Sequence, residues 1–164
     1  VVAVILSWMA MLIYVGWRFE FRYALGGILA LVHDVIITIG AISIMNMEFT
    51  ITILAALIFI IGFSINDTIV TLDRIKENVK LNLKKRLSDI INVSINQTLS
   101  RTVLTSLTVF LTVLALYIFG GAVIHDFAFA LLVGVVIGTY SSIYIACTIV
   151  LLFKNLRIAK TKRG

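Results

Sequence analysis

The chain has no proline, only one cysteine and few charged residues. Its charged fraction is 13% and its hydrophobic fraction is 61%, whereas a soluble domain has about 25% charged and about 45–50% apolar residues. This shortage of charge excludes an ordinary soluble domain and predicts a polytopic membrane protein. The single cysteine, Cys147, cannot form an internal disulfide bond, and its apolar neighbours in the sequence predict a packing role.

The sequence also lacks the groups of side chains that carry covalent chemistry. It contains no cluster of metal ligands, no nucleophile beside a base and no phosphate-binding loop, and its two histidines, His33 and His125, are far apart. The basic residues are not interleaved with aromatic side chains, on which nucleic-acid bases would stack. We therefore expect neither an enzyme nor a nucleic-acid-binding protein, and no metal ion or cofactor.

Five apolar stretches are each long enough to cross a bilayer, which takes about 20 residues. In chain order they are Val1–Trp17, Ala24–Met45, Phe49–Leu72, Thr102–Val123 and Phe127–Phe153. The last stretch is long and must tilt or extend past the membrane interface. The sequence therefore predicts an all-α transmembrane domain over residues 1–153, followed by a basic cytoplasmic tail over residues 154–164.

The basic residues fix the expected orientation. All 14 Lys and Arg residues lie in three segments, which are Arg18–Arg22, Arg74–Arg101 and Lys154–Arg163. The other two connections, which contain Glu48 and the pair His125-Asp126, have none. By the positive-inside rule the basic connections and the C-terminus are cytoplasmic, where they can contact anionic lipids. The chain then starts on the outer side, which predicts a further helix upstream in a longer protein.

The one long connection, residues 73–101, has an apolar residue at every fourth position. The repeating residues are Ile75, Val79, Leu83, Leu87, Ile91, Ile95 and Leu99. This spacing predicts a basic amphipathic helix along the inner membrane surface. Asn82 and Ser88-Asp89 are potential breaks, so two helices remain as good an interpretation as one. The segment is either a simple connector or a docking surface for a partner.

Asp67 is the most informative residue because it ends an apolar stretch without charge, Phe49–Asn66. An ionisable side chain within a membrane span is costly unless it is paired or faces water, so it marks a functional site. On a helix, Ser64 and Thr71 lie on the same face as Asp67. Arg101 enters the next span from the same side, and an Asp67–Arg101 pair would lower the cost of burying either charge.

Two further sets of polar residues lie within the spans. Thr105, Thr108 and Thr112 follow Arg101 along one helix face. They form either interhelical hydrogen bonds or a hydrated path to the Asp67–Arg101 pair.

His33 and Asp34 point about 100° apart on a helix, and Asp34 is expected to face inward. It shares a face with small and polar residues, which are Gly26, Ala30 and Thr38. A functional role and an internal packing role both remain open for Asp34.

The last span has small residues at every fourth position, which are Gly134, Gly138, Ser142 and Ala146. Small residues at this spacing allow two helix backbones to approach closely in a membrane. The pattern predicts that this helix packs tightly against another one, without showing which.

Four separated motifs resemble signatures of the SecF family. They are Ile61–Asn78, Ala30–Val35, Ser94–Thr102 with Thr105–Thr108 after it, and Gly138–Ala146. They occur in order and at compatible spacing, so the resemblance covers nearly the whole chain.

The resemblance implies five of the six membrane helices of one half of a resistance–nodulation–division (RND) type protein, without the first span and the periplasmic domain. It implies partnership with SecD in the bacterial inner membrane, and use of a proton or sodium gradient to draw preproteins through SecY, SecE and SecG. YajC and SecA are further implied partners. Ion coupling falls on Asp67 and Arg101, with Asp34, Ser64, Asn66, Thr105 and Thr108 as relay or supporting groups.

Two alternatives to ion-driven protein export remain open. The chain could be a non-conducting scaffold of the translocon, in which Asp67 and Arg101 form a structural ion pair. It could also be half of an RND-type exporter of small molecules or lipids.

Overall fold

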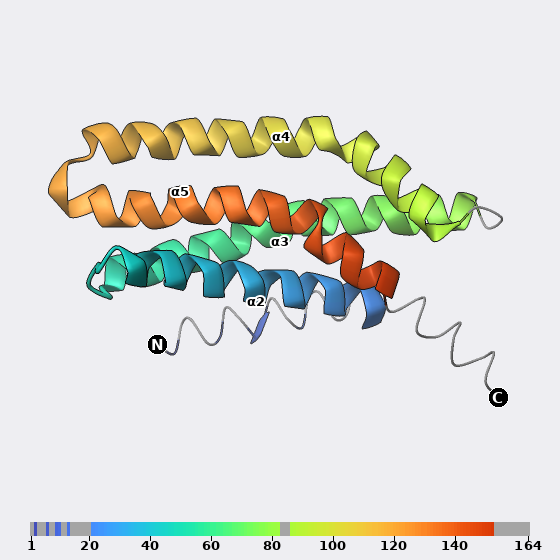
Figure 1. Ribbon diagram of the computed structural model, residues 1–164, viewed down its shortest axis with the longest axis horizontal. Helices are drawn as coiled ribbons and strands as arrows, with labels where there is room; N and C mark the ends of the chain where they lie inside the picture. Colours follow the sequence, from blue (N-terminus) through green and yellow to red (C-terminus); the bar gives the residue numbers. More distant parts are fainter. Residues whose placement is uncertain are drawn as a thin grey trace.

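The computed structural model describes residues 21–82 and 86–152, with a few isolated positions before residue 21. The described ranges form four long helices, which are α2 (Phe21–Ile44), α3 (Ile51–Leu81), α4 (Leu87–Phe119) and α5 (Gly121–Ile143). They run side by side along the long axis of the molecule (Figure 1). After an interruption at Tyr144 the chain is helical again over residues 145–152. The predicted span Val1–Trp17 lies outside the described residues.

Each of the four helices is long and apolar enough to cross a membrane, counting α5 through to Leu152. This agrees with the all-α membrane protein expected from composition. Helix α5 is central, since it packs against α2, α3 and α4. Helix α4 is the least enclosed, because it contacts α3 and α5 along one side and has many exposed apolar residues on the other.

Short turns join α2 to α3 at one end of the bundle. Asn46 adopts the left-handed conformation with φ 52°, while its N–H donates to the Ser43 carbonyl and the Met47 N–H donates to the Ile42 carbonyl. This pattern is the Schellman motif, in which asparagine or glycine ends a helix. Thr50 then caps α3, because its hydroxyl accepts a hydrogen bond from the Ile53 N–H at 3.3 Å.

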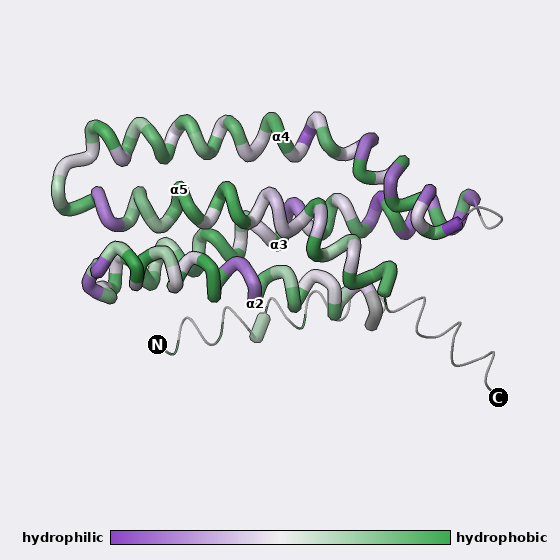
Figure 2. Tube along the Cα trace, viewed as in Figure 1, coloured by the Kyte–Doolittle hydropathy of each residue, from purple (hydrophilic) through white to green (hydrophobic). Residues whose placement is uncertain are grey.

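The other end of the bundle extends beyond the thickness of a membrane. Helices α3 and α4 have 31 and 33 residues, which is about 46 and 50 Å at 1.5 Å per residue, whereas the hydrocarbon core is about 30 Å thick. Figure 2 shows hydrophilic residues gathered where these two helices meet. Arg74, Lys76, Lys80 and Arg86 lie there, at the opposite end from Glu48 and Asp126.

The structure corrects the prediction of a separate amphipathic surface helix over residues 73–101. This segment is the end of α3 and the start of α4, with the break at Asn82, as one of the two interpretations allowed. Ser88-Asp89 lies in the first turn of α4 and is no break. Five residues of the apolar stripe pack between the helices instead of in lipid headgroups, since Ile75, Leu87 and Ile91 belong to one core cluster, with Val79 and Ile95 against it. Leu99 is exposed.

A second correction concerns the connection between the last two spans. The sequence predicted a span as far as Val123, a connection with His125-Asp126 and a helix from Phe127, but α4 ends at Phe119 and α5 begins at Gly121. Gly121 has φ 71°, a conformation that residues other than glycine rarely adopt. This glycine reverses the chain directly after α4, so His125 and Asp126 lie within α5.

Two apolar clusters fill the bundle, with polar residues between them. One cluster includes Ile75 and Val150 toward the α3–α4 turn, and the other includes Ile53 and Leu131 toward the opposite end. On α2 and α5 the residues between the clusters include buried polar ones, and on α3 Ser64 lies next to the boundary, between Ile61 and Ile65 of the first cluster. The buried polar residues here are Asp34, Thr38, Ser64, Ser141 and Ser142.

The small residues of α5 pack against α3, which identifies the partner that their spacing left open. A Cβ atom added to Gly134 would overlap the side chain of Ile60, which is fully buried. A Cβ atom added to Gly138 would lie 3.3 Å from the Cβ atom of Ser64. Glycine at these positions therefore lets α5 approach α3 closely enough for their polar groups to meet.

We predict that Gly134→Ala lowers the free energy of unfolding by about 1–3 kcal/mol, because overpacking a well-filled core costs this much. Gly40→Ala is the matched control, since nothing lies within 4 Å of a Cβ atom added there. It should be neutral or slightly stabilising, as alanine favours a helix over glycine. Denaturation in detergent measures both. Equal stability of the two variants would contradict the tight α3–α5 contact.

Candidate functional site

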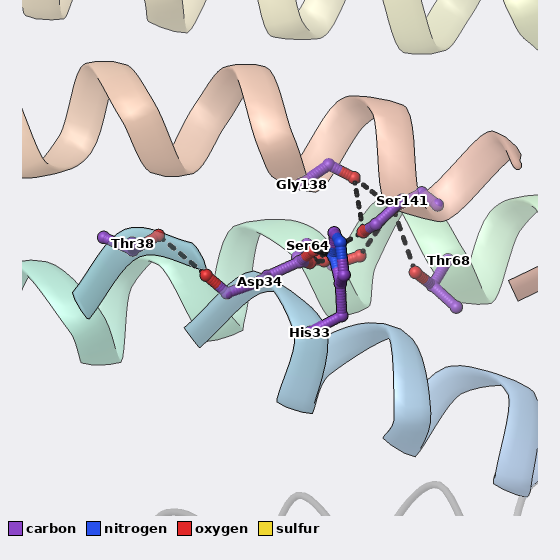
Figure 3. A network of polar contacts seen from close by, with 8 residues as sticks. His33, Asp34, Thr38, Ser64, Thr68, Gly138 and Ser141 are labelled. Carbon is purple, nitrogen blue, oxygen red and sulfur yellow. Dashed lines mark hydrogen bonds and ion pairs between the residues drawn. The ribbon is translucent and has the colours of Figure 1, made fainter. Parts of the chain in front are cut away.

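Asp34 of α2 is the centre of a polar cluster inside the bundle (Figure 3). Its side chain is 1% exposed. The Ser64 hydroxyl of α3 donates to Asp34 Oδ2 at 2.5 Å, and the Ser141 hydroxyl of α5 donates to the same oxygen at 2.8 Å. One carboxylate thus joins three helices. The prediction that Asp34 faces inward is confirmed.

Hydroxyl contacts extend the cluster along the α3–α5 interface. The Ser142 hydroxyl lies 3.0 Å from that of Thr68 and 3.3 Å from the carbonyl oxygen of Ser64. Ser141 and Ser142 also donate to the Gly138 carbonyl on their own helix. Ser141 also reaches Asp34 of α2, whereas Ser142 reaches α3, where Gly138 brings the two backbones together.

His33 links this cluster to the surface of the bundle. Its Nδ1 atom lies 3.2 Å from Asp34 Oδ1, and its side chain is 32% exposed. Thr38 lies on the other side, where its hydroxyl donates to the Asp34 carbonyl oxygen at 2.8 Å. The Asp34 carboxylate is therefore hydrogen-bonded by two serines and has one ionisable neighbour.

Asp67 lies one helical turn beyond Ser64 and has a different environment. Its side chain is 4% exposed, and its Oδ2 atom has no hydrogen-bond partner. Arg101 and Ser106 of α4 are the polar groups that act on the carboxyl group. Thr71, one turn further along α3, is also buried with an unpartnered hydroxyl. As predicted, Ser64, Asp67 and Thr71 are all buried.

The predicted ion pair between Asp67 and Arg101 is not formed. Within the described residues no ion pair of 4.0 Å or less joins them, and Arg101 is exposed on α4. The two residues lie on adjacent helices as expected, but Arg101 belongs to the least enclosed helix of the bundle. Its charge acts on Asp67 without closing a direct contact.

Arg101 lines an open groove of about 400 Å³ between α3 and α4. Asp73, Arg74, Glu77 and Gln97 also line it. Arg74 crosses from α3 to α4, where its Nε donates to Gln97 Oε1 at 2.7 Å. Six of the seven residues that line the groove are polar or charged, and it opens at the basic end of the bundle, so water can approach Arg101 from that side.

A buried amide contributes to the same interface and was missed by the sequence reasoning. Asn78 of α3 donates to Ser94 Oγ at 2.8 Å and to Gln97 Oε1 at 2.9 Å. Asn78 lies in the motif Ile61–Asn78, and Ser94 and Gln97 lie in the motif Ser94–Thr102. Nothing in the local spacing of these residues showed that they pair across α3 and α4.

Among the described residues, the threonines after Arg101 do not form interhelical bonds. Thr105, Thr108 and Thr112 are exposed, and each donates to the carbonyl oxygen four residues earlier on α4. Asn66 is exposed as well. Ser106 and Thr139 make the hydroxyl contact between α4 and α5 instead, at 2.8 Å. Of the two roles considered for these threonines, interhelical hydrogen bonding is therefore not seen among the described helices.

No group of three His, Cys, Asp or Glu side chains comes together in the described part of the chain to hold a metal ion. The chemistry available in the bundle interior is that of two buried carboxylates, one bound by hydroxyls and one incompletely bound. Such groups can hold and exchange protons.

The fold and this site define an all-helical, polytopic membrane protein with ionisable groups buried between its helices. The family model described as "Protein export membrane protein SecD/SecF, C-terminal" matches residues 1–156. The chain belongs to this family.

Known relatives agree with this assignment. The chain is 53% identical over 150 residues to the protein translocase subunit SecF of Magnetococcus marinus, covering 92% of this chain and 48% of that protein. The crystal structure of SecDF in its super-membrane-facing form matches with 49% identity and a TM-score of 0.89, covering 94% of this chain and 21% of that one.

The crystal structure of SecDF from Thermus thermophilus, described as a translocon-associated membrane protein, matches with 51% identity and a TM-score of 0.85. That match covers 88% of this chain and 20% of the other. The chain spans about half the length of the curated relatives that it matches.

The two carboxylates should respond differently to removal. We predict that Asp34→Ala lowers the free energy of unfolding by about 1–3 kcal/mol, because it leaves buried hydroxyls without their acceptor. Asp67→Ala should cost less or be stabilising, since its Oδ2 has no hydrogen bond to lose. Thermal denaturation of the purified variants compares them. A larger loss for Asp67→Ala would contradict the assignment of hydrogen bonds.

Proposed function

We propose that this chain is the membrane part of a SecF-type subunit that works with SecD to drive protein export with an ion gradient. The observation that carries the proposal is Asp67, a buried carboxyl group in a membrane helix with an oxygen that has no hydrogen-bond partner. A polar group left in this state destabilises the fold. Intramembrane carboxylates of this kind mark ion pathways and proton relays.

In this proposal Asp67 binds and releases the ion, and Arg101 modulates it from α4. Arg101 acts on Asp67 without a direct ion pair, so a small movement of α4 toward or away from α3 changes the electrostatic field at the carboxyl group. The groove lined by Arg101 supplies water on the basic side. The basic residues at that end support its being cytoplasmic.

The identity to SecF proteins supports protein export as the process that this movement serves. The role that fits is translocation of preproteins through SecY, SecE and SecG, with SecD as the direct partner. The exposed face of α4, with Thr105, Thr108 and Thr112, is available to a neighbouring membrane subunit. The same arrangement would serve a proton or a sodium ion.

We predict that Asp67→Asn abolishes gradient-driven ion flux while the variant still assembles with SecD. Asparagine preserves the shape of the side chain but cannot exchange a proton. The measurement is ion flux in inverted vesicles that contain the full-length protein and SecD. Asp89→Asn is a matched control, since Asp89 is an exposed carboxylate in the first turn of α4. Wild-type flux and export in Asp67→Asn would refute ion coupling at this residue.

A charge swap separates this function from the scaffold alternative. If Asp67 and Arg101 only stabilise the structure as opposite charges, the double variant Asp67→Arg with Arg101→Asp should restore export. If Asp67 carries the ion, the double variant should assemble and remain inactive. Restored export would favour the scaffold.

A further inference from the structure

We propose that His33 and Asp34 form a second proton-binding site, and that the proton held there sets how firmly α2 and α5 hold α3. This inference rests on the proposed function, because α3 is the helix that carries Asp67. It adds a site on α2 that contacts α3 at Ser64, one helical turn from Asp67.

Asp34 is buried, so a negative charge on it requires compensation. The carboxyl group is 1% exposed, and its only ion-pair partner in the described part of the chain is His33. An ionised carboxylate without a positive partner is costly inside a membrane. The pair therefore holds one proton, either on His33 Nδ1 or on Asp34 Oδ1, and is neutral overall in both cases.

Within the described residues, the other ionisable groups of α3 and α5 are too far along these helices to replace His33. On α3 the next one is Asp67, one turn beyond Ser64, which faces Arg101 and Ser106 of α4. The charged end of α3 starts at Asp73, about two and a half turns from Ser64. On α5 and its continuation, the nearest ionisable side chains are Tyr140, Tyr144 and Cys147, and none of them hydrogen-bonds to Asp34.

His33 gives the buried carboxyl group a route for its proton. The side chain of His33 is 32% exposed, whereas Ser64 and Ser141, the other two groups on the carboxylate, are fully buried. Uptake adds one proton to the pair and changes its charge from −1 to 0, and release reverses this change. No other group is consumed or formed.

The protonation of Asp34 itself, and not of His33, changes the bonds that hold the helices together. Ser64 of α3 and Ser141 of α5 both donate to Asp34 Oδ2. Hydrogen bonds to an ionised carboxylate are roughly twice as strong as those between neutral groups. An ionised Asp34 therefore holds the three helices firmly, and a protonated Asp34 loosens them.

This site acts on Asp67 through α3, which carries Asp67 and is bound to Asp34 through Ser64. Ser64 and Asp67 are three residues apart and lie on nearly the same face of α3. Loosening the bond at Ser64 frees α3 to shift against α2 and α5, and the same shift moves Asp67 relative to Arg101. His33–Asp34 is thus a positioning site for the ion-coupling residue.

The experiment is pH-dependent infrared difference spectroscopy on the full-length protein assembled with SecD. We expect the carbonyl band of a protonated carboxyl group that is lost in Asp34→Asn and retained in Asp67→Asn. Ser64→Ala and Ser141→Ala should each shift this band to higher frequency, because the carboxyl group loses a hydrogen bond. Thr38→Val is the matched control, since Thr38 is buried but bonds only to the backbone of Asp34. It should leave the band in place.

Several results would overturn the site. One is the absence of any band that depends on Asp34 over the pH range in which the complex stays assembled. Another is a band that neither serine variant moves. If Asp34→Asn fails to assemble, the serine variants decide the matter, since they keep the carboxyl group.

The band is independent of flux, so its failure is distinguishable from failure of the proposed function. A present band with wild-type flux in Asp67→Asn would refute only Asp67 as the coupling residue. The functional readout is the dependence of ion flux on pH, which should differ between Ser64→Ala and the wild type. Superimposable profiles would reduce Asp34 to a packing residue.

Discussion

Convergence of two hydroxyls on one buried carboxylate oxygen is the interaction on which the helix arrangement depends. Ser64 and Ser141 come from different helices, yet both donate to Asp34 Oδ2. In a membrane no water is available to satisfy a misplaced polar group, so the three helices must meet in this register. The glycines of α5 serve the same end, because only a close approach to α3 brings these hydroxyls within reach. The apolar clusters on either side then fill the remaining space.

Unlike Asp34, Asp67 has a carboxylate oxygen without a hydrogen-bond partner. The two carboxylates are both buried, but one has a full set of partners and the other has a free oxygen. Buried polar groups without partners are rare in folded proteins and call for an explanation. A changing set of partners during an ion-coupling cycle is such an explanation. Arg101 fits it as well, since an exposed residue on a loosely held helix can approach Asp67 or withdraw from it.

Much of this could be predicted from the sequence, because membrane helices obey local rules. Runs of apolar residues gave the helices, the 3.6-residue period placed Asp34 inward, and small residues at every fourth position predicted tight packing of α5.

Contacts distant in sequence could not be predicted in this way. Ser141 lies 107 positions from Asp34, and no local spacing joins them. The apolar stripe over residues 73–101 was read correctly as helical but assigned to lipid, since periodicity shows that a face is buried and not what buries it. The α4–α5 connection was predicted, but it is shorter than expected because one glycine with positive φ, Gly121, reverses the chain.

The central claim is that Asp67 changes its protonation state when an ion gradient drives the protein. The most direct test is an infrared difference spectrum of the full-length complex with SecD in vesicles, recorded with and without an imposed proton gradient. The account predicts a gradient-dependent carboxyl signal that disappears in Asp67→Asn and persists in Asp89→Asn. A signal that survives in Asp67→Asn, or its absence from the wild type during active export, would contradict it.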